Sequence, residues 1–448
     1  MLPPEYKGLT EYKNKNVRKR VNKIQQIKNK IHTLSKKTVS LITIQAIIVS
    51  MMAISGCGLF SKDSKETQNI QLENNVSTDI IIVERVEELG DTENSNVSEL
   101  PEKDLAKAKE DLVPDGLKYY AYDHLNDEEK LLYTEIYGIL DNCASDTKVS
   151  SKDPDQIEKA FNYVMLDHPE IFYITGYSFT KYMRGQNIEK ITLSGTYTMN
   201  KADVERSRLA VEAYIDKCIS EYPGSADEYE KVKYVYEYLI KNTEYDLTAP
   251  NNQNVLSVVE EKKTVCQGYA KAMQLILNRM GVFCILCEGV VKGTESHVWD
   301  IVRINGSFYH VDTTWGDASY RIEDNAEGFE APEINHDYLC VTDDAIKETH
   351  VIKDNIELPV CDSMEDNYYV REGLYLTEVD TDIISSAFDK AIDRGEKIVT
   401  LKSANANVYT AVFNHLIDNH KIFDYLHGST SVNYVEFKDE CRISFYLK

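Results

Sequence analysis

The sequence predicts an α+β fold distributed over two or three domains. Runs with helical apolar spacing and runs that alternate apolar with polar residues occupy separate blocks of the chain, which is typical of α+β folds. The chain has 448 residues, more than one ordinary core holds. Its 42% of apolar residues and its 30 tyrosines can fill sizeable cores, which excludes a wholly disordered protein.

Charge is distributed unevenly along the chain. The formal net charge is −24, yet residues 1–37 hold 11 Lys and Arg against two Glu, and residues 38–56 carry no charged side chain. The rest of the chain is therefore strongly acidic. An acidic body repels phosphate backbones, and no nucleic-acid motif is present, so we expect no nucleic-acid partner.

Residues 1–56 are organised as an export signal. A basic run precedes the apolar stretch 38–56, as in the n-region and h-region of a signal peptide. Residues 54–57, Ile-Ser-Gly-Cys, resemble the lipobox of bacterial lipoproteins, with Ile where Leu is usual. The resemblance implies cleavage, lipidation of Cys57, and a membrane-anchored protein on the extracytoplasmic face. The alternative is an uncleaved helix, because 19 uncharged residues nearly span a bilayer.

The next two segments differ in composition. Residues 57–110 are polar and acidic with few aromatics, and we interpret them as a flexible tether. Residues 111–201 predict an N-terminal α+β accessory unit. Its elements are a helix capped by Asn126, a second helix from Pro154 to Leu166, and two antiparallel strands within 171–183 and 189–199.

Two further domains complete the predicted organisation. The amphipathic helices 202–222 and 226–242 open a central domain, for which we expect the bounds 202–350. A C-terminal α+β accessory domain at 366–448 has the pattern β-α-β-α-β-β and offers no catalytic constellation. Its predicted strands are 368–376, 397–402, 432–438 and 442–448, and its helices lie near 382–394 and 407–419.

Cys266 stands at a chemically favourable position. It directly precedes a helical pattern that contains Ala270, Met273 and Leu277 and that Gly281 is placed to end. The free amides and the dipole of a helix N-terminus favour the thiolate, which is the nucleophilic form of cysteine. Most free cysteines are inert core residues, so a nucleophilic role also requires a base.

A predicted hairpin supplies that base. Residues 298–304 and 307–313 alternate as strands around the turn Asn305-Gly306. With a two-residue turn, His297 and Asp312 lie on one face as diagonal neighbours, roughly 7–8 Å apart at the backbone. A carboxylate there would hold one imidazole nitrogen and leave the other to take the thiol proton.

These residues resemble the transglutaminase-like superfamily, whose domains perform acyl transfer with a papain-like Cys-His-Asp triad. The matching motifs are V-C-Q-G-Y-A at 265–270, H-V-W at 297–299 and H-V-D-T-T-W at 310–315. The resemblance implies a core in which the helix carrying Cys266 packs on an antiparallel sheet carrying His297 and Asp312. It assigns Cys266 as the nucleophile, His297 as the general base and acid, and Asp312 as the residue that orients His297.

Further residues of the motifs are candidates for substrate binding or for shielding the site from water. They are Gln267, Tyr269, Trp299 and Trp315. For the two tryptophans, plain core packing is the simpler interpretation. His310 shares the face of Asp312, but the resemblance places the base at His297, so we interpret His310 as structural.

The other cysteines and the acidic residues predict no cofactor. Cys284 and Cys287 form a lone C-x-x-C whose spacing on a strand sends the side chains to opposite faces, so we expect core cysteines. A zinc site made of the three triad residues would lack a fourth ligand at the usual spacing. No D-x-D-x-D-G calcium loop is present, so we infer no metal.

Together these patterns predict a membrane-anchored cysteine acyl-transferase. It would form a thioester with peptide or amide substrates at the cell surface or wall, and hydrolysis is favoured over crosslinking. Two alternatives are a non-catalytic surface-binding or scaffold lipoprotein that keeps the fold, and a lipoprotein whose C-terminal domain does the essential binding.

Overall fold

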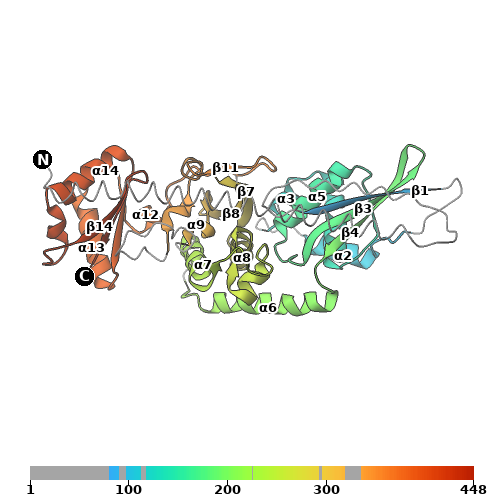
Figure 1. Cartoon of the computed structure of the whole chain (residues 1–448), viewed down its shortest axis with the longest axis horizontal. Helices are drawn as coiled ribbons and strands as arrows, with labels where there is room; N and C mark the ends of the chain where they lie inside the picture. Colours follow the sequence, from blue (N-terminus) through green and yellow to red (C-terminus); the bar gives the residue numbers. More distant parts are fainter. Residues whose placement is uncertain are drawn as a thin grey trace, which may run out of the picture. The chain divides into compact units, whose positions relative to one another are not determined.

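The computed structural model describes residues 80–89, 97–112, 118–224, 226–291, 295–317 and 334–447. The predicted signal segment, Cys57 and residues 57–79 of the predicted tether lie outside the described residues. Among the helices of the described ranges, none is long and apolar enough to cross a membrane. Helices accompany three larger sheets and one two-stranded ribbon (Figure 1), which confirms the predicted α+β class.

The first sheet has the strand order β1-β3-β4-β2. Its strands β3 and β4 are the predicted antiparallel pair, and Asn126 begins α4 with the predicted cap, reinforced by Glu129 in a capping box. The bounds are β1 Ile81–Glu88, α2 Glu102–Asp111, α3 Tyr120–Asp123, α4 Asp127–Asp141, β2 Thr147–Val149, α5 Pro154–Asp167, β3 Ile174–Arg184 and β4 Asn187–Tyr197.

The prediction of a flexible tether over 57–110 is wrong for its second half. Strand β1 pairs in parallel with β3, from Ile81 opposite Gly176 to Glu88 opposite Met183, and α2 contacts α4. A sheet edge offers backbone hydrogen bonds to any extended segment, so β1 needs little apolar surface of its own. The short apolar run 80–83 was the local signal, and the acidic composition around it obscured that signal.

The central sheet has the order β10-β9-β8-β7-β11, and α8 packs against β7 and β8. The helices α6 and α7 precede it in the chain, as predicted. The bounds are α6 Lys201–Ser220, α7 Glu228–Asn242, β5 Glu244–Tyr245, η1 Ser257–Glu261, β6 Lys263–Thr264, α8 Cys266–Arg279, β7 Cys284–Val291, β8 Glu295–Ile304, β9 Ser307–Val311, α9 Thr313–Gly316, η2 His336–Tyr338, β10 Leu339–Val341, α11 Asp343–Ile346 and β11 His350–Ile352.

The C-terminal strands and helices follow the predicted order, with one correction. Residues 368–371 form the helix α12 instead of a strand, because Asn367 caps it and Gly373, at φ 71°, ends the turn before β12. The sheet order is β12-β13-β15-β14. The bounds are α12 Tyr368–Arg371, β12 Tyr375–Leu376, α13 Thr381–Asp393, β13 Ile398–Ser403, α14 Ala406–Phe413, η3 Asn414–Asp418, η4 Lys421–Tyr425, β14 Asn433–Phe437 and β15 Arg442–Tyr446.

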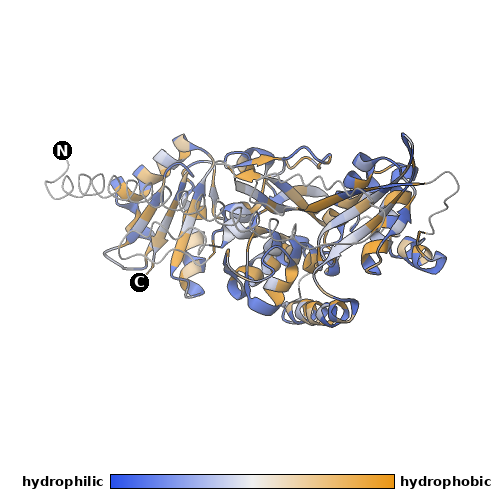
Figure 2. Ribbon diagram, turned by 45° about the vertical axis from the view of Figure 1, so that its right-hand side comes forward, coloured by the Kyte–Doolittle hydropathy of each residue, from blue (hydrophilic) through white to orange (hydrophobic). Residues whose placement is uncertain are grey.

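Buried apolar side chains form three clusters. The largest runs from Ala108 to Ile356 and so joins the N-terminal sheet to one face of the central sheet. A second cluster covers the other face of the central sheet, and a third fills the C-terminal residues from Leu376 to Phe445. In Figure 2 the helices change between orange and blue residues along their length, as expected of amphipathic helices packed on sheets.

Candidate active site

Cys266 is the first residue of α8, as the sequence predicts. Val265 is extended at φ −120° and ψ −172°, and it provides no side-chain cap, so the first amides of the helix stay available at the Cys266 end. Gly268 lets the first turn of α8 pack closely against Thr264, because a Cβ at position 268 would lie 1.8 Å from Thr264 Oγ1. Cys266 is half-buried and unpaired by any disulfide. The helix therefore presents a free thiol at its positive end.

The predicted hairpin register is confirmed. Asn305 and Gly306 form the two-residue turn at φ 52° and 90°, and Ile304 pairs with Ser307. Strand β8 also pairs with β7, which places His297 opposite Gly289. The site histidine is thus held on a strand with a neighbour on each side along the sheet.

Asp312 lies directly after β9 and meets His297 there. His297 Nε2 lies 2.7 Å from Asp312 Oδ2, and both side chains are buried. Asp312 Oδ1 accepts the Trp315 amide at 3.0 Å, so the carboxylate also caps α9. Because Nε2 faces Asp312, the Nδ1 atom of His297 is left for another partner, and the Cys266 thiol is among the groups that act on the pKa of His297.

The electrostatics of this group favour an ion pair. Burial acts to lower the pKa of His297, but Asp312 and the Cys266 thiol outweigh it and raise the pKa to about 10. Burial acts to raise the pKa of Asp312, but His297 and His350 outweigh it and hold the pKa below its ordinary value. Both shifts favour a cationic His297 imidazole paired with an anionic Asp312 carboxylate.

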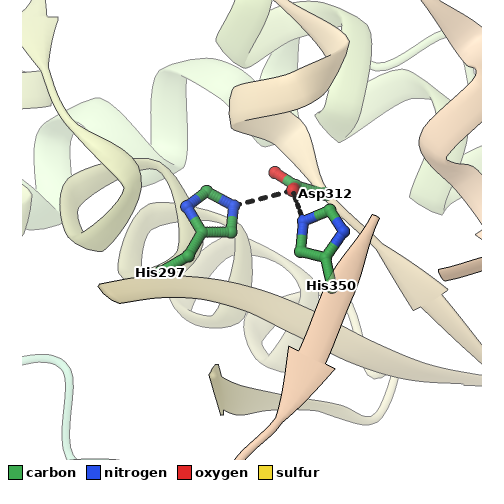
Figure 3. Close-up of side chains that lie close together, drawn as sticks. All are labelled: His297, Asp312 and His350. Atoms are coloured by element: carbon green, nitrogen blue, oxygen red, sulfur yellow. Dashed lines mark hydrogen bonds and ion pairs between the residues drawn. The ribbon is translucent and has the colours of Figure 1, made fainter. Parts of the chain in front are cut away.

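A second histidine, which sequence reasoning missed, completes this group. His350 begins β11, and its Nε2 lies 3.0 Å from the same Asp312 Oδ2. Figure 3 shows both imidazoles directed at the one carboxylate oxygen from two different strands. His350 pairs across β11 and β7 with Val291, far away in sequence, so no local spacing indicated its position.

Comparisons with known proteins agree with this geometry. Residues 219–313 match the family model described as the transglutaminase-like superfamily, and this range contains all three predicted triad residues. The chain carries a transglutaminase-like domain. The predicted core, with the Cys266 helix packed against the sheet that holds His297, is the fold that the structure has.

The relatives share only part of their length with this chain. Two proteins named Kyphoscoliosis peptidase, from Homo sapiens and Mus musculus, are each 25% identical over 133 residues. The match covers 26% of this chain and 20% of each relative, so the chain spans about a fifth of their length. A solved structure titled as a crystal structure of a TGase is 14% identical, covers 35% of this chain and 56% of its own, and has a TM-score of 0.24.

Both tryptophans of the chain border the histidine pair of the transglutaminase-like domain. The Trp299 ring stacks on His297 with centroids 5.9 Å apart, and the Trp315 ring lies 4.9 Å from His350. Trp299 is 1% exposed, whereas Trp315 is half-buried. Trp299 is therefore a core residue, in agreement with the packing that is the simpler interpretation of its sequence, and both rings border the two histidines.

His310 has structural contacts in the transglutaminase-like domain, in agreement with its interpretation. Trp299 Nε1 donates to His310 Nδ1 at 3.0 Å, so the proton of a neutral His310 resides on Nε2, which lies 2.9 Å from Asp343 Oδ1. Burial lowers the pKa of His310, consistent with a neutral ring. These bonds hold the Trp299 indole beside His297.

Gln267 and Tyr269 lie deeper than their predicted role requires. Gln267 is 6% exposed, and Tyr269 is fully buried with its hydroxyl 2.8 Å from Asp317 Oδ2 and 2.9 Å from the Thr243 carbonyl. Tyr269 therefore packs in the core and offers no surface to a substrate. Cys284 and Cys287 are buried on opposite faces of β7, in different apolar clusters, as predicted for core cysteines.

Two side-chain groups of the described ranges have the residue types of metal ligands. They are His297, Asp312 and His350, and His310, Asp343 and Cys361, with the candidate ligand atoms of each within 4.8 Å of one another. In the first group, separations of 2.7 and 3.0 Å fit hydrogen bonds to Asp312. In the second, the Trp299 bond leaves the proton of His310 on the nitrogen that a metal would need. Hydrogen bonds therefore account for the short separations in both groups of side chains.

Proposed function

We propose that Cys266, His297 and Asp312 are the catalytic triad of a cysteine acyl-transferase that hydrolyses peptide or amide bonds. The observation that carries the proposal is the 2.7 Å bond between His297 and Asp312, with the Cys266 thiol at the start of α8 acting on the pKa of the same imidazole. These residues have the chemistry that a nucleophile, a base and an orienting carboxylate require.

The reaction would follow from these positions. The Cys266 thiolate attacks the substrate carbonyl, and the C–N bond breaks as His297 gives its Nδ1 proton to the departing amine. Water then attacks the resulting thioester and gives a proton to His297, and the C–S bond breaks to release the carboxylic acid and regenerate the Cys266 thiolate. The Cys266 amide has no acceptor within its helix because it lies in the first turn, and it is the donor we propose for the oxyanion.

Hydrolysis is preferred over crosslinking because the named relatives are peptidases. Substrates would be peptides or proteins of the cell surface or wall, if the chain is lipidated at Cys57 and anchored outside the cytoplasm as the export signal predicts. Anchoring beside its substrates would raise their effective concentration at the site.

An activated ester tests the chemistry without knowledge of the substrate. We expect p-nitrophenyl acetate to acetylate Cys266 of the full chain, detected by peptide mass spectrometry, and water to remove the acetyl group. His297→Ala should slow acetylation by on the order of 10²–10⁴-fold, the usual contribution of a general base. Added cadaverine should leave the rate of deacetylation unchanged, because water is the proposed acceptor.

Cys143 is the matched internal control, since it is also a half-buried free thiol. Acetylation of Cys266 no faster than that of Cys143, with no effect of His297→Ala, would contradict the proposed function. Formation of acetyl-cadaverine in place of acetate would show that the acyl group is transferred to an amine, and the proposed reaction would then be transamidation instead of hydrolysis.

A further inference from the structure

The geometry points to His350 as a positioning residue that acts on His297 through Asp312. By donating a second hydrogen bond to Asp312 Oδ2, His350 fixes the carboxylate and takes up part of its charge, so that His297 can release its proton to the leaving amine. This inference deepens the proposed function and rests on it for its catalytic meaning.

Asp312 shares one oxygen between two imidazoles. Oδ2 lies 2.7 Å from His297 Nε2 and 3.0 Å from His350 Nε2, while Oδ1 is occupied by the Trp315 amide. A carboxylate oxygen accepts about two hydrogen bonds, so His350 fills the position left beside His297. Each donor withdraws part of the negative charge that would otherwise act on the other.

The surroundings hold the His350 ring in this orientation. His350 is 1% exposed, and the rings of Trp299, Trp315 and Tyr338 lie around it at centroid distances of 5.0, 4.9 and 5.9 Å. Its ring centroid is 5.3 Å from that of His297. Asp312 is the charged group with which His350 is paired among these rings.

The Asp312 carboxylate only accepts, so the His350 proton that faces it is on Nε2, and Thr349 lies at the other ring nitrogen. Thr349 Oγ1 lies 2.8 Å from His350 Nδ1, and a weaker contact of 3.4 Å joins it to the Ile346 carbonyl. A hydroxyl that donates to Nδ1 leaves the single proton of a neutral His350 on Nε2, directed at Asp312. The chain of donors thus runs from Thr349 through His350 to Asp312.

The other titratable groups near this carboxylate are few. Cys266 of α8 acts electrostatically on His297, and the buried Tyr236 of α7 and Asp300 of β8 interact electrostatically with Asp312. Tyr236 donates to the Asn335 carbonyl at 2.7 Å, and burial raises the pKa of Asp300, which disfavours a second negative charge beside Asp312. His297 and His350 are therefore the two groups that balance the charge of Asp312.

The test measures the ionisation of His297 directly. In full chain labelled with ¹⁵N-histidine and carrying Cys266→Ser, which removes the titration of the thiol, the ring nitrogens of His297 are followed against pH. His350→Phe should raise the His297 midpoint by about 0.5–1 pH unit, because Asp312 then acts on His297 alone. His350→Gln, whose amide can donate to Asp312, should keep it within about 0.3 unit of the parent.

Two further variants control the experiment. Thr349→Val should shift the His297 midpoint in the same direction as His350→Phe by a smaller amount, and it keeps the test available if His350→Phe does not fold. His415→Gln, at a histidine of the C-terminal residues whose ring bonds the Tyr425 hydroxyl at 3.3 Å, should leave the midpoint unmoved. Equal midpoints in the parent, His350→Phe and Thr349→Val would overturn the inference.

The two proposals fail separately. A His297 shift together with an unreactive Cys266 would preserve the coupling through Asp312 and refute the catalytic function. A reactive Cys266 with no His297 shift would preserve the function and reduce His350 to a packing residue.

Discussion

At the scale of single residues, the site depends on keeping a buried carboxylate charged. Asp312 is fully buried, and an isolated buried carboxylate would be protonated. Its three donors, the Trp315 amide, His297 and His350, offset that cost. The outcome is a lowered pKa for Asp312 and a raised pKa for His297, to about 10.

This pair predicts how stability depends on pH. Asp312, with its lowered pKa, contributes above the ordinary range of Asp, and its contribution is lost as pH falls toward the lowered value. His297, with its raised pKa, contributes fully below about pH 6.5, and that contribution is lost as pH rises toward about 10. Between these limits the ion pair stabilises the fold.

Asp312→Asn should therefore lower stability near pH 6 by on the order of 2 kcal/mol, the value of a hydrogen bond to a charged group. This difference in stability between the variant and the unmutated chain should shrink toward pH 9.5. The stability of Asp312→Asn should therefore fall less steeply with rising pH than that of the unmutated chain. Thermal unfolding can be followed by tryptophan fluorescence, because both tryptophans of the chain lie beside this site.

Asp343→Asn is the matched control, because Asp343 bonds His310, whose pKa is lowered and which forms no comparable ion pair. Its effect should be similar at pH 6 and pH 9.5. An Asp312→Asn curve parallel to that of the unmutated chain would refute a charged His297.

At the scale of elements, local patterns were predictable and long-range pairings were not. The Asn305-Gly306 turn fixes the register of β8 and β9, so the sequence alone placed His297 near Asp312. The N-terminal position of Cys266 followed from the helical spacing and Gly281. By contrast, β11 and β1 join their sheets through partners distant in sequence, and each is short or polar, so His350 and the order of residues 81–88 were missed.

At the scale of the whole molecule, the described residues form three buried apolar clusters. One buried cluster runs from Ala108 to Ile356, and another fills the C-terminal residues from Leu376 to Phe445. Helix α5 of the N-terminal unit is linked to α8 by a buried bond from Gln274 Nε2 to the Leu166 carbonyl at 3.0 Å. The proposed triad lies between two clusters, because α8 packs in the larger one while Trp299, which stacks on His297, belongs to the cluster on the other face of the central sheet. The anchor proposed at Cys57 would tether this part of the chain through residues outside the described ranges.

The export signal predicts a specific modification. In a bacterial host, the full chain should sediment with membranes and yield an N-terminal peptide that begins at a lipidated Cys57, whereas Cys57→Ser should not be lipidated or processed at this position. Mass spectrometry of the N-terminal peptide and cell fractionation provide the measurement. An unmodified Cys57 with an intact residue 1–56 segment would instead support the uncleaved helix.

The alkylation rate of Cys266 against pH tests the central claim most directly. Iodoacetamide would be applied to the full chain, with Cys143 as internal reference because burial raises the pKa of that thiol. The proposed triad predicts a Cys266 rate that remains high well below the pKa of about 8.5 of a free thiol and that falls in His297→Ala and Asp312→Ala. A Cys266 rate that rises only above pH 8, parallel to that of Cys143 and unchanged by either substitution, would contradict an imidazole-activated nucleophile and favour a non-catalytic binding module.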